Sequence, residues 1–193
     1  MKADGNSRSI LLVEGVSDRI AIETLAERRG LDLAAEGVSV IAMGGATQIG
    51  TYLDQYGPRG LGLRLAGLYD AGEAGVVGRS LGRAGLGSDL TSEAMEALGF
   101  YMCVNDLEDE LIRAVGMEAI ERVVESAGDL RAFRTFQVQP AWRGRPFDRQ
   151  FRRFLGAGAR RKIRYASLLV QAMDLSRTPR PLEAVLEHIR LRE

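Results

Sequence analysis

Residues 11–26 read LLVEGVSDRIAIETLA, and this stretch decides the predicted fold class. It begins within a short apolar run, residues 9–13 (SILLV), of the kind found in strands buried on both faces of a parallel sheet. The run ends at Glu14, and a helix is expected to follow, with Ser17 as its N-cap and its end near Arg29. A buried strand that leads directly into a helix predicts the first half of a βαβ unit.

The same alternation of strand and helix continues along the first half of the chain. Further strands are predicted at 37–43, 63–69 and 98–104, and a further helix at about 47–55. The segment after the third strand contains Gly72, Gly75 and Gly78, and is expected to be a loop or a poor helix start. Strands and helices at this spacing predict an α/β fold with a parallel sheet of about four strands flanked by helices.

The strand pattern stops near Asp106, and the rest of the chain has helical patterns. These are predicted at 106–116, 117–127, 145–155, 159–173 and 181–191. The domain organisation is therefore expected to be an α/β core over residues 1–115, followed by a C-terminal helical extension over residues 116–193. A basic helix of the extension is expected to complete the active site.

The composition limits the class of protein and of metal site. Cys103 is the single cysteine, so a disulfide framework is excluded and a reducing, cytoplasmic location is expected. Cys103 lies in an apolar run and is expected to be a buried hydrophobic residue. Neither a signal peptide nor a membrane-spanning stretch is predicted. Zinc is not expected, because Cys103 and His188 are the only residues of its preferred ligand types.

The charges are unevenly distributed, although the formal net charge is zero. Residues 89–129 hold eleven acidic residues and two arginines, whereas residues 131–164 hold eleven basic residues and one acid. This asymmetry suits a metal-dependent enzyme acting on a polyanion, and it equally suits two solvated helix faces. Lys2 and Lys162 are the only lysines among 26 basic residues, which makes Lys162 a candidate for a specific role.

Four carboxylates fall near the ends of predicted strands: Glu14, Asp18, Asp70 and Asp106. The carboxyl ends of parallel strands share one edge of the sheet, where ligands bind. Carboxylates that converge there repel one another unless they are protonated or share a cation, and oxygen ligands suit Mg²⁺ or Mn²⁺. Asp18, Asp70 and Asp106 could each be a helix cap, but a glutamate that closes a buried strand has no capping role. No P-loop and no GxGxxG motif accompanies these residues.

The order of these features resembles the TOPRIM domain, a Rossmann-like fold, and most closely that of the OLD (overcoming lysogenization defect) family of nucleases. The motifs that carry the resemblance are VEGVSD within residues 11–26, GLYDAGEAG at 67–75, DLEDEL at 106–111 and RRKIRYASLLVQAM at 160–173. The resemblance covers about residues 9–173. It implies a Mg²⁺- or Mn²⁺-dependent endonuclease that cleaves phosphodiester bonds of DNA by two-metal chemistry.

The resemblance also implies roles for individual residues. Glu14 and Asp18 would bind one metal ion, with Asp70 across the cleft, and Asp106 and Glu108 would complete a second site. Lys162 would face the scissile phosphate as a catalytic residue, together with Glu14. The arginines expected to contact nucleic acid are Arg160, Arg161 and Arg164, with Arg143 and Arg145 in the segment 133–147, where aromatic residues alternate with arginines. Stacking and phosphate contacts in that segment would suit single strands or frayed ends, but Phe133, Phe136 and Trp142 are rather expected to seal the helical extension onto the sheet.

Two departures from the family pattern affect these expectations. Gly72 occupies the place of the second acid of an Asp-x-Asp pair, and Glu73 is the nearest candidate to replace it as a metal ligand. OLD nucleases normally carry an ATPase domain ahead of TOPRIM, and no ATPase motif is found in this sequence. The chain is therefore expected either to work alone or to dock on a separate ATPase subunit. A second copy of the chain, forming a homodimer, is another candidate partner.

RNA stays open as a substrate. The alternative function is a non-catalytic module that binds nucleic acid or an ATPase. A receiver-like domain switched by phosphorylation fits less well. Such a domain would have a pair of acids at the end of its first strand, whereas Glu14 is followed here by Gly15.

Overall fold

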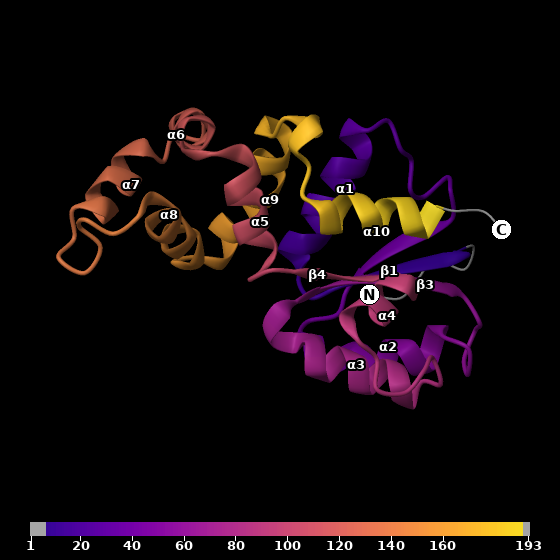
Figure 1. Ribbon diagram of the computed structural model, residues 1–193. Helices are drawn as coiled ribbons and strands as arrows, with labels where there is room; N and C mark the ends of the chain where they lie inside the picture. Colours follow the sequence, from indigo (N-terminus) through magenta and orange to yellow (C-terminus); the bar gives the residue numbers. More distant parts are fainter. Residues whose placement is uncertain (1–6, 191–193) are drawn as a thin grey trace.

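The structure, a computed structural model, describes residues 7–190 and has a parallel four-stranded sheet with helices on both faces (Figure 1). The strands are β1 (Ser9–Val13), β2 (Val38–Ala42), β3 (Arg64–Asp70) and β4 (Phe100–Cys103), in the order β2-β1-β3-β4. Ile10 pairs with Ser39 on one side and with Leu65 on the other, which fixes the register at the centre of the sheet. The predicted α/β fold class is confirmed.

The two faces of the sheet are covered by two separate buried clusters. Leu11 and Val13 point towards the cluster that includes α1 (Val16–Arg28), α9 (Ala159–Ala172) and α10 (Arg180–Arg190). Ile10 and Leu12 point the other way, towards α2 (Ile49–Tyr56), α3 (Ala74–Arg83) and α4 (Ser92–Ala97). Because both faces are covered, each apolar residue of β1 is buried, and each such side chain contributes about 1.5–3 kcal/mol.

The remaining helices form an arm beside the sheet (Figure 1). They are α5 (Leu107–Val115), α6 (Met117–Ser126), α7 (Leu130–Gln137) and α8 (Phe147–Gly156). Phe133 of α7 is fully buried and makes ring contacts with Phe147, Phe151 and Phe154 of α8. Phe151 in turn contacts Tyr165 of α9. The aromatic residues therefore have the packing role that was expected, but they join the helices of the arm to one another and to α9.

The chain returns to the sheet after the arm. α9 packs against α1, and α10 lies over β3 and β4, so the last two helices share one buried cluster with the strands. The boundary expected at residue 115 stays a prediction. None of the helices within residues 7–190 combines the length and the apolar character needed to cross a membrane.

Several local predictions need correction. Helix α1 starts at Val16 with Gly15 as its N-cap, because Ser17 donates to Asp18 rather than capping the helix. The glycine-rich segment after β3 forms a short 3₁₀ turn (Ala71–Glu73) and then α3, which is stabilised by burial of Val77 and Leu81. Two helices, α4 and α7, are absent from the predicted set. Both are short, at six and eight residues, so each offers few turns over which a helical pattern can be recognised.

Candidate active site

The carboxyl ends of the strands bring acidic residues from three segments to one edge of the sheet. Glu14 follows β1, Asp70 is the last residue of β3, and Asp106 lies three residues after β4 as the N-cap of α5. The strands are parallel and β1, β3 and β4 are consecutive neighbours, so these ends lie side by side. The chain leaves β1 towards β2 on one side, whereas β3 and β4 lie on the other. The acids therefore meet at the topological switch point, where open α/β sheets bind their ligands.

The backbone at Glu14 is held by the loop after β2. Its carbonyl oxygen accepts hydrogen bonds from Gly44 N–H at 2.9 Å and from Gly45 N–H at 3.2 Å. Both glycines have positive φ, 80° and 127°, which side chains with a Cβ rarely adopt. The two glycines thus allow the β2 loop to turn back and fix the end of β1.

Asp18 is held next to Glu14 by the first turn of α1. Its Oδ2 accepts the Gly15 N–H at 2.8 Å, and its Oδ1 accepts the Ser17 hydroxyl at 3.3 Å. Gly15 has φ −130°, which any residue can adopt, and an added Cβ there would lie 3.6 Å from Asp18 Oδ2. The glycine is therefore not required by the backbone, and its lack of a side chain leaves space in front of the Asp18 carboxylate.

The loop after β4 and the first turn of α5 supply two more acids, each of which has a cation as partner. Asp106 accepts the Asp109 N–H at 2.9 Å and forms an ion pair with Arg152 of α8. Glu108 forms an ion pair with Lys162 of α9, with 2.9 Å between Nζ and Oε1. The Glu108 side chain is only 12% exposed, so its charge needs a partner here.

Glu110 fixes the loop that carries these acids. It is buried, at 5% exposure, and its carboxylate accepts the Val104 N–H at 2.9 Å. Arg113 balances its charge at 2.7 Å. Glu110 therefore positions the turn between β4 and α5.

The five carboxylates Glu14, Asp18, Asp70, Asp106 and Glu108, called the acidic cluster below, repel one another. Burial raises the pKa of Asp70 to about 7, and the charges of the other four members add to this effect. Burial likewise raises the pKa of Asp18 to about 6, assisted by Glu108 and Glu14 and opposed by the Gly15 N–H and by Lys162. Crowding of this kind is relieved when the carboxylates share a proton or a cation.

Lys162 supplies part of the compensating charge. Burial lowers its pKa, but the hydrogen bond and charge of Glu108, with the charges of Asp18 and Asp106, outweigh burial and raise it. Lys162 is therefore a stable cation at neutral pH, in contact with the acidic cluster.

The donor set fits a hard divalent cation. All members of the acidic cluster bind through oxygen, as Mg²⁺ and Mn²⁺ prefer. Glu14, Asp18 and Asp70 form no ion pair with any other residue in 7–190, and the missing side chain of Gly15 leaves Asp18 open. However, no three acidic, His or Cys side chains within the described part of the chain already stand at metal-binding spacing. Binding a second ion at Asp106 and Glu108 would also require Arg152 and Lys162 to move away.

The remaining predicted site residues are less closely associated with this edge. Glu73 is the N-cap of α3 and is not among the four carboxylates with the largest effect on the pKa of Asp70. Arg161 donates to the Phe154 carbonyl and lies over its ring, and Arg164 donates to the Ala127 carbonyl. The other three predicted arginines, Arg143, Arg145 and Arg160, are exposed.

Sequence reasoning missed Arg152 and Glu110. Arg152 belongs to the basic segment 131–164, but nothing local marks it as the partner of Asp106. Glu110 lies in the DLEDEL motif among other acids, and only its burial separates it from them. Cys103 is buried as predicted, and burial raises the pKa of its thiol well above the usual range.

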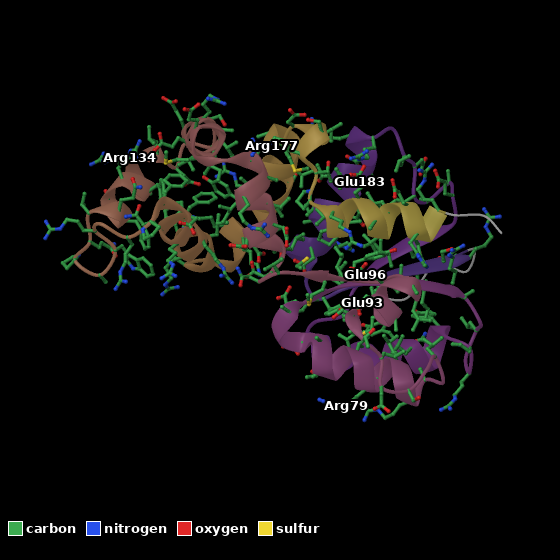
Figure 2. All side chains as sticks on the ribbon, viewed as in Figure 1. Arg79, Glu93, Glu96, Arg134, Arg177 and Glu183 are labelled. Carbon is green, nitrogen blue, oxygen red and sulfur yellow. The ribbon has the colours of Figure 1, made fainter. Side chains whose placement is uncertain are left out.

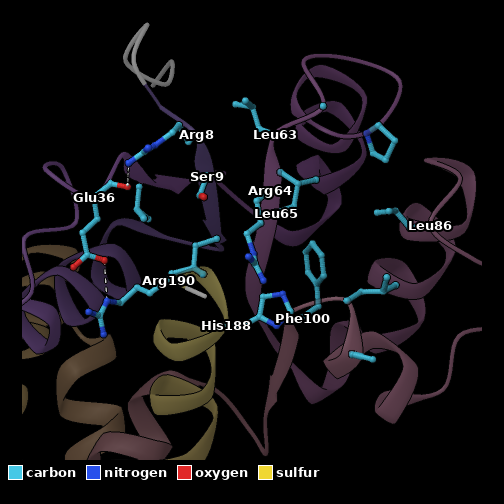
Figure 3. Close-up of a pocket in the computed structure, with 16 residues that line it drawn as sticks. Arg8, Ser9, Glu36, Leu63, Arg64, Leu65, Leu86, Phe100, His188 and Arg190 are labelled. Atoms are coloured by element: carbon cyan, nitrogen blue, oxygen red, sulfur yellow. Dashed lines mark hydrogen bonds and ion pairs between the residues drawn. The ribbon is translucent and has the colours of Figure 1, made fainter. Parts of the chain in front are cut away.

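A cavity lies at the opposite edge of the sheet, at the amino ends of the strands (Figure 3). It has a volume of about 690 Å³, and its lining includes Ser9, Arg64 and His188. Arg8 and Arg190, which also line it, both bond to Glu36, through its carbonyl and carboxylate respectively. This cavity is separate from the acidic cluster, which occupies the carboxyl ends of the same strands.

Comparison with known proteins agrees with this fold. Residues 7–71 match the family described as "Overcoming lysogenization defect protein-like, TOPRIM domain". The chain is similar to the C-terminal region of the Xanthomonas campestris pv. campestris OLD protein, with a TM-score of 0.74 and 25% identity over 97% of this chain and 96% of that one. It shares the fold of the C-terminal region of the Burkholderia pseudomallei OLD protein, with a TM-score of 0.73 and 23% identity over 95% and 97% of the two chains. No curated protein matches the sequence.

Proposed function

We propose that this chain, which contains an OLD-like TOPRIM domain, is a divalent-metal-dependent nuclease that hydrolyses phosphodiester bonds of DNA. The observation that carries the proposal is the acidic cluster itself. Five carboxylates from three loops share one edge of the sheet, and the pKa of Asp70 is raised to about 7 by burial and by the other four. Repulsion among these carboxylates destabilises the fold, and metal binding would explain why they lie together.

The residues would divide the work as follows. Glu14, Asp18 and Asp70 would hold one Mg²⁺ or Mn²⁺ ion, and Asp106 and Glu108 would hold a second. When bound, such ions would supply Lewis acidity and lower the pKa of water, so that hydroxide is available to attack phosphorus near neutral pH. Lys162 would neutralise charge that develops on the phosphate oxygens, which is the task of a positioned cation in phosphoryl transfer. Arg152, released from Asp106, could contact the phosphate as well.

A second candidate function is a module that binds nucleic acid or an ATPase without cleaving. The observation that favours it is that Asp106 and Glu108 already have protein cations as partners. Gly72 also lacks the carboxylate that would strengthen a second metal site. In either function we propose a cytoplasmic location, where DNA and an ATPase partner would be accessible.

The experiment that separates the two is cleavage of supercoiled plasmid in Mg²⁺, Mn²⁺ or EDTA. Wild type is compared with Glu14→Gln and Lys162→Gln, whose folding is checked by circular dichroism. Nicking that requires metal and is lost in both variants supports the nuclease. A folded wild type that binds DNA but leaves plasmid, linear duplex and single strands intact would favour the binding module.

A further inference from the structure

A groove runs along α8 next to the acidic cluster. It has a volume of about 810 Å³ and opens to solvent. The lining residues used below are Asn105, Trp142, Arg145, Arg149, Arg152 and Arg153. Figure 2 shows nitrogen-tipped side chains along this side of α8. We call this feature the α8 groove.

The groove is positively charged. Four arginines line it, together with Asp109 and Asp148. Asp109 accepts hydrogen bonds from Asn105 at 3.1 Å and from Arg113 at 3.0 Å, and Arg113 also pairs with Glu110. The four arginines of the lining still outnumber its two aspartates. The arginines are exposed to solvent. An exposed, net positive groove of this kind attracts a polyanion.

Folding accounts for only one of the three arginines on this face of α8. Arg152 pairs with Asp106. Arg149 lies three residues before Arg152 and four before Arg153, and like-charge pairs at this spacing destabilise a helix by about 0.2–0.5 kcal/mol each. The opposite face of α8 carries the apolar packing, with Phe151, Phe154 and Leu155 buried. Arg149 and Arg153 are therefore available to bind a ligand.

An aromatic ring forms part of the same wall. Trp142 stacks on Phe136, with 5.4 Å between ring centroids and an interplanar angle of 27°. Its carbonyl accepts the side-chain amide of the buried Gln150 at 2.8 Å, which holds the loop in place. The indole is only partly buried. A fixed, accessible ring among arginines is suited to stacking with an unpaired base.

The groove leads to the acidic cluster. Asn105 lines the groove and is followed directly by Asp106, a member of the cluster. Arg152 lines the groove and also pairs with Asp106. A strand bound along α8 would therefore present its backbone to the carboxylates.

From these contacts we propose that the α8 groove binds one single-stranded segment of the nucleic-acid substrate. Arg149 and Arg153 contact its phosphates, and Trp142 stacks on a base. Arg152 stands between the strand and Asp106. This assignment rests on the proposed function, because it takes the acidic cluster as the place where the bound strand is cut.

The test measures binding by fluorescence anisotropy in EDTA, where cleavage is absent, with labelled single-stranded and blunt duplex DNA. The groove variant is R149E/R153E. The matched control is R79E/R177E, which makes the same charge change at exposed arginines on other parts of the molecule (Figure 2). The groove variant is expected to weaken single-strand binding at least about tenfold and to reduce the salt dependence by about two phosphate contacts, whereas the control is expected to retain wild-type binding. Trp142→Leu is expected to weaken single-strand binding about tenfold and duplex binding much less, with its fold checked by thermal melting.

Equal losses in the groove variant and the control would overturn the proposal, as would a wild type that binds no DNA. Duplex binding as tight as single-strand binding, with Trp142→Leu neutral on both, would overturn the single-strand assignment. The nuclease proposal fails separately. If wild type binds through the groove and cuts nothing in Mg²⁺ or Mn²⁺, the groove proposal is supported and the nuclease proposal is wrong. If wild type cuts and R149E/R153E binds and cuts normally, the nuclease proposal is supported and the groove proposal is wrong.

Discussion

The ammonium group of Lys162 lies 2.9 Å from a carboxylate oxygen of Glu108. Helix α9 thus supplies a protein cation to an acid on α5, within the group of carboxylates proposed to bind metal. A bound metal ion and Lys162 would compete for the same carboxylate. The pair therefore makes separate predictions about metal affinity and about catalysis.

Replacing Lys162 by Gln should change these two properties in opposite directions. Without the ammonium, Glu108 is available to a cation, so Mn²⁺ should bind several-fold more tightly in isothermal titration calorimetry. Cleavage should fall by about 10²–10³-fold, because a positioned charge at the developing phosphate charge is lost. Arg160→Gln, two residues earlier in the same helix, is the control and should leave Mn²⁺ affinity unchanged. Unchanged Mn²⁺ affinity in K162Q would show that Lys162 and the metal do not share Glu108.

Gly72→Asp should strengthen metal binding. Gly72 is exposed, and a Cβ built there meets no atom within 4 Å, so the new side chain should fit without loss of stability. An acid two residues after Asp70 would restore the Asp-x-Asp spacing and add an oxygen ligand. Mn²⁺ affinity measured by titration should rise.

The control for this change is Gly75→Asp, which adds the same charge at an exposed position three residues further along. Equal affinity gains in both variants would mean that general charge, rather than a new ligand at position 72, causes the effect.

The location of the acidic cluster could be predicted from sequence, but its cation partners could not. Glu14 and Asp70 close apolar strands, and parallel strands place their carboxyl ends together. That argument needs only local patterns and one topological rule. The pairs Arg152–Asp106 and Lys162–Glu108 join residues 46 and 54 positions apart, and they depend on how α8 and α9 pack against α5.

Two local errors of the sequence prediction also arise from contacts that the sequence pattern does not show. Ser17 is a good N-cap by type, but the Asp18 carboxylate accepts both the Gly15 N–H and the Ser17 hydroxyl, so the helix begins two residues earlier. Helix α3 forms in spite of its glycines because burial of Val77 and Leu81 overrides their low helix propensity.

Stability should depend on pH through Asp70 when metal is removed. Its pKa in the folded protein is about 7, raised by burial and neighbouring carboxylates, against an ordinary value of 3.8. Between these values the folded state binds more protons than the unfolded state, so this residue's contribution to stability falls as the pH rises from about 4 to about 7. In EDTA, the melting temperature of wild type should therefore decline relative to that of Asp70→Asn over this range.

Adding Mg²⁺ should restore the loss at pH 7 and above in wild type, because a bound cation favours the ionised carboxylate. Asp70→Asn should gain less. Parallel melting curves for the two proteins in EDTA at every pH would contradict the assigned repulsion, and equal stabilisation by Mg²⁺ would contradict Asp70 as a metal ligand.

Glu110 should matter for both folding and activity although it is not proposed to touch substrate or metal. Glu110→Ala leaves the Val104 N–H without its acceptor and leaves Arg113 with Asp109 as its carboxylate partner, which should lower the free energy of unfolding by about 1–3 kcal/mol. Glu110→Gln keeps an oxygen that can accept the Val104 N–H and should lose less stability.

Because Glu110 orients the turn that leads to Asp106, the Ala variant should lower kcat more than it changes KM. The Gln variant should recover part of kcat. The exposed Glu118 on α6 provides the control, and Glu118→Ala should leave both stability and kcat near wild type. An Ala variant at position 110 with reduced stability but normal kcat would limit Glu110 to a structural role.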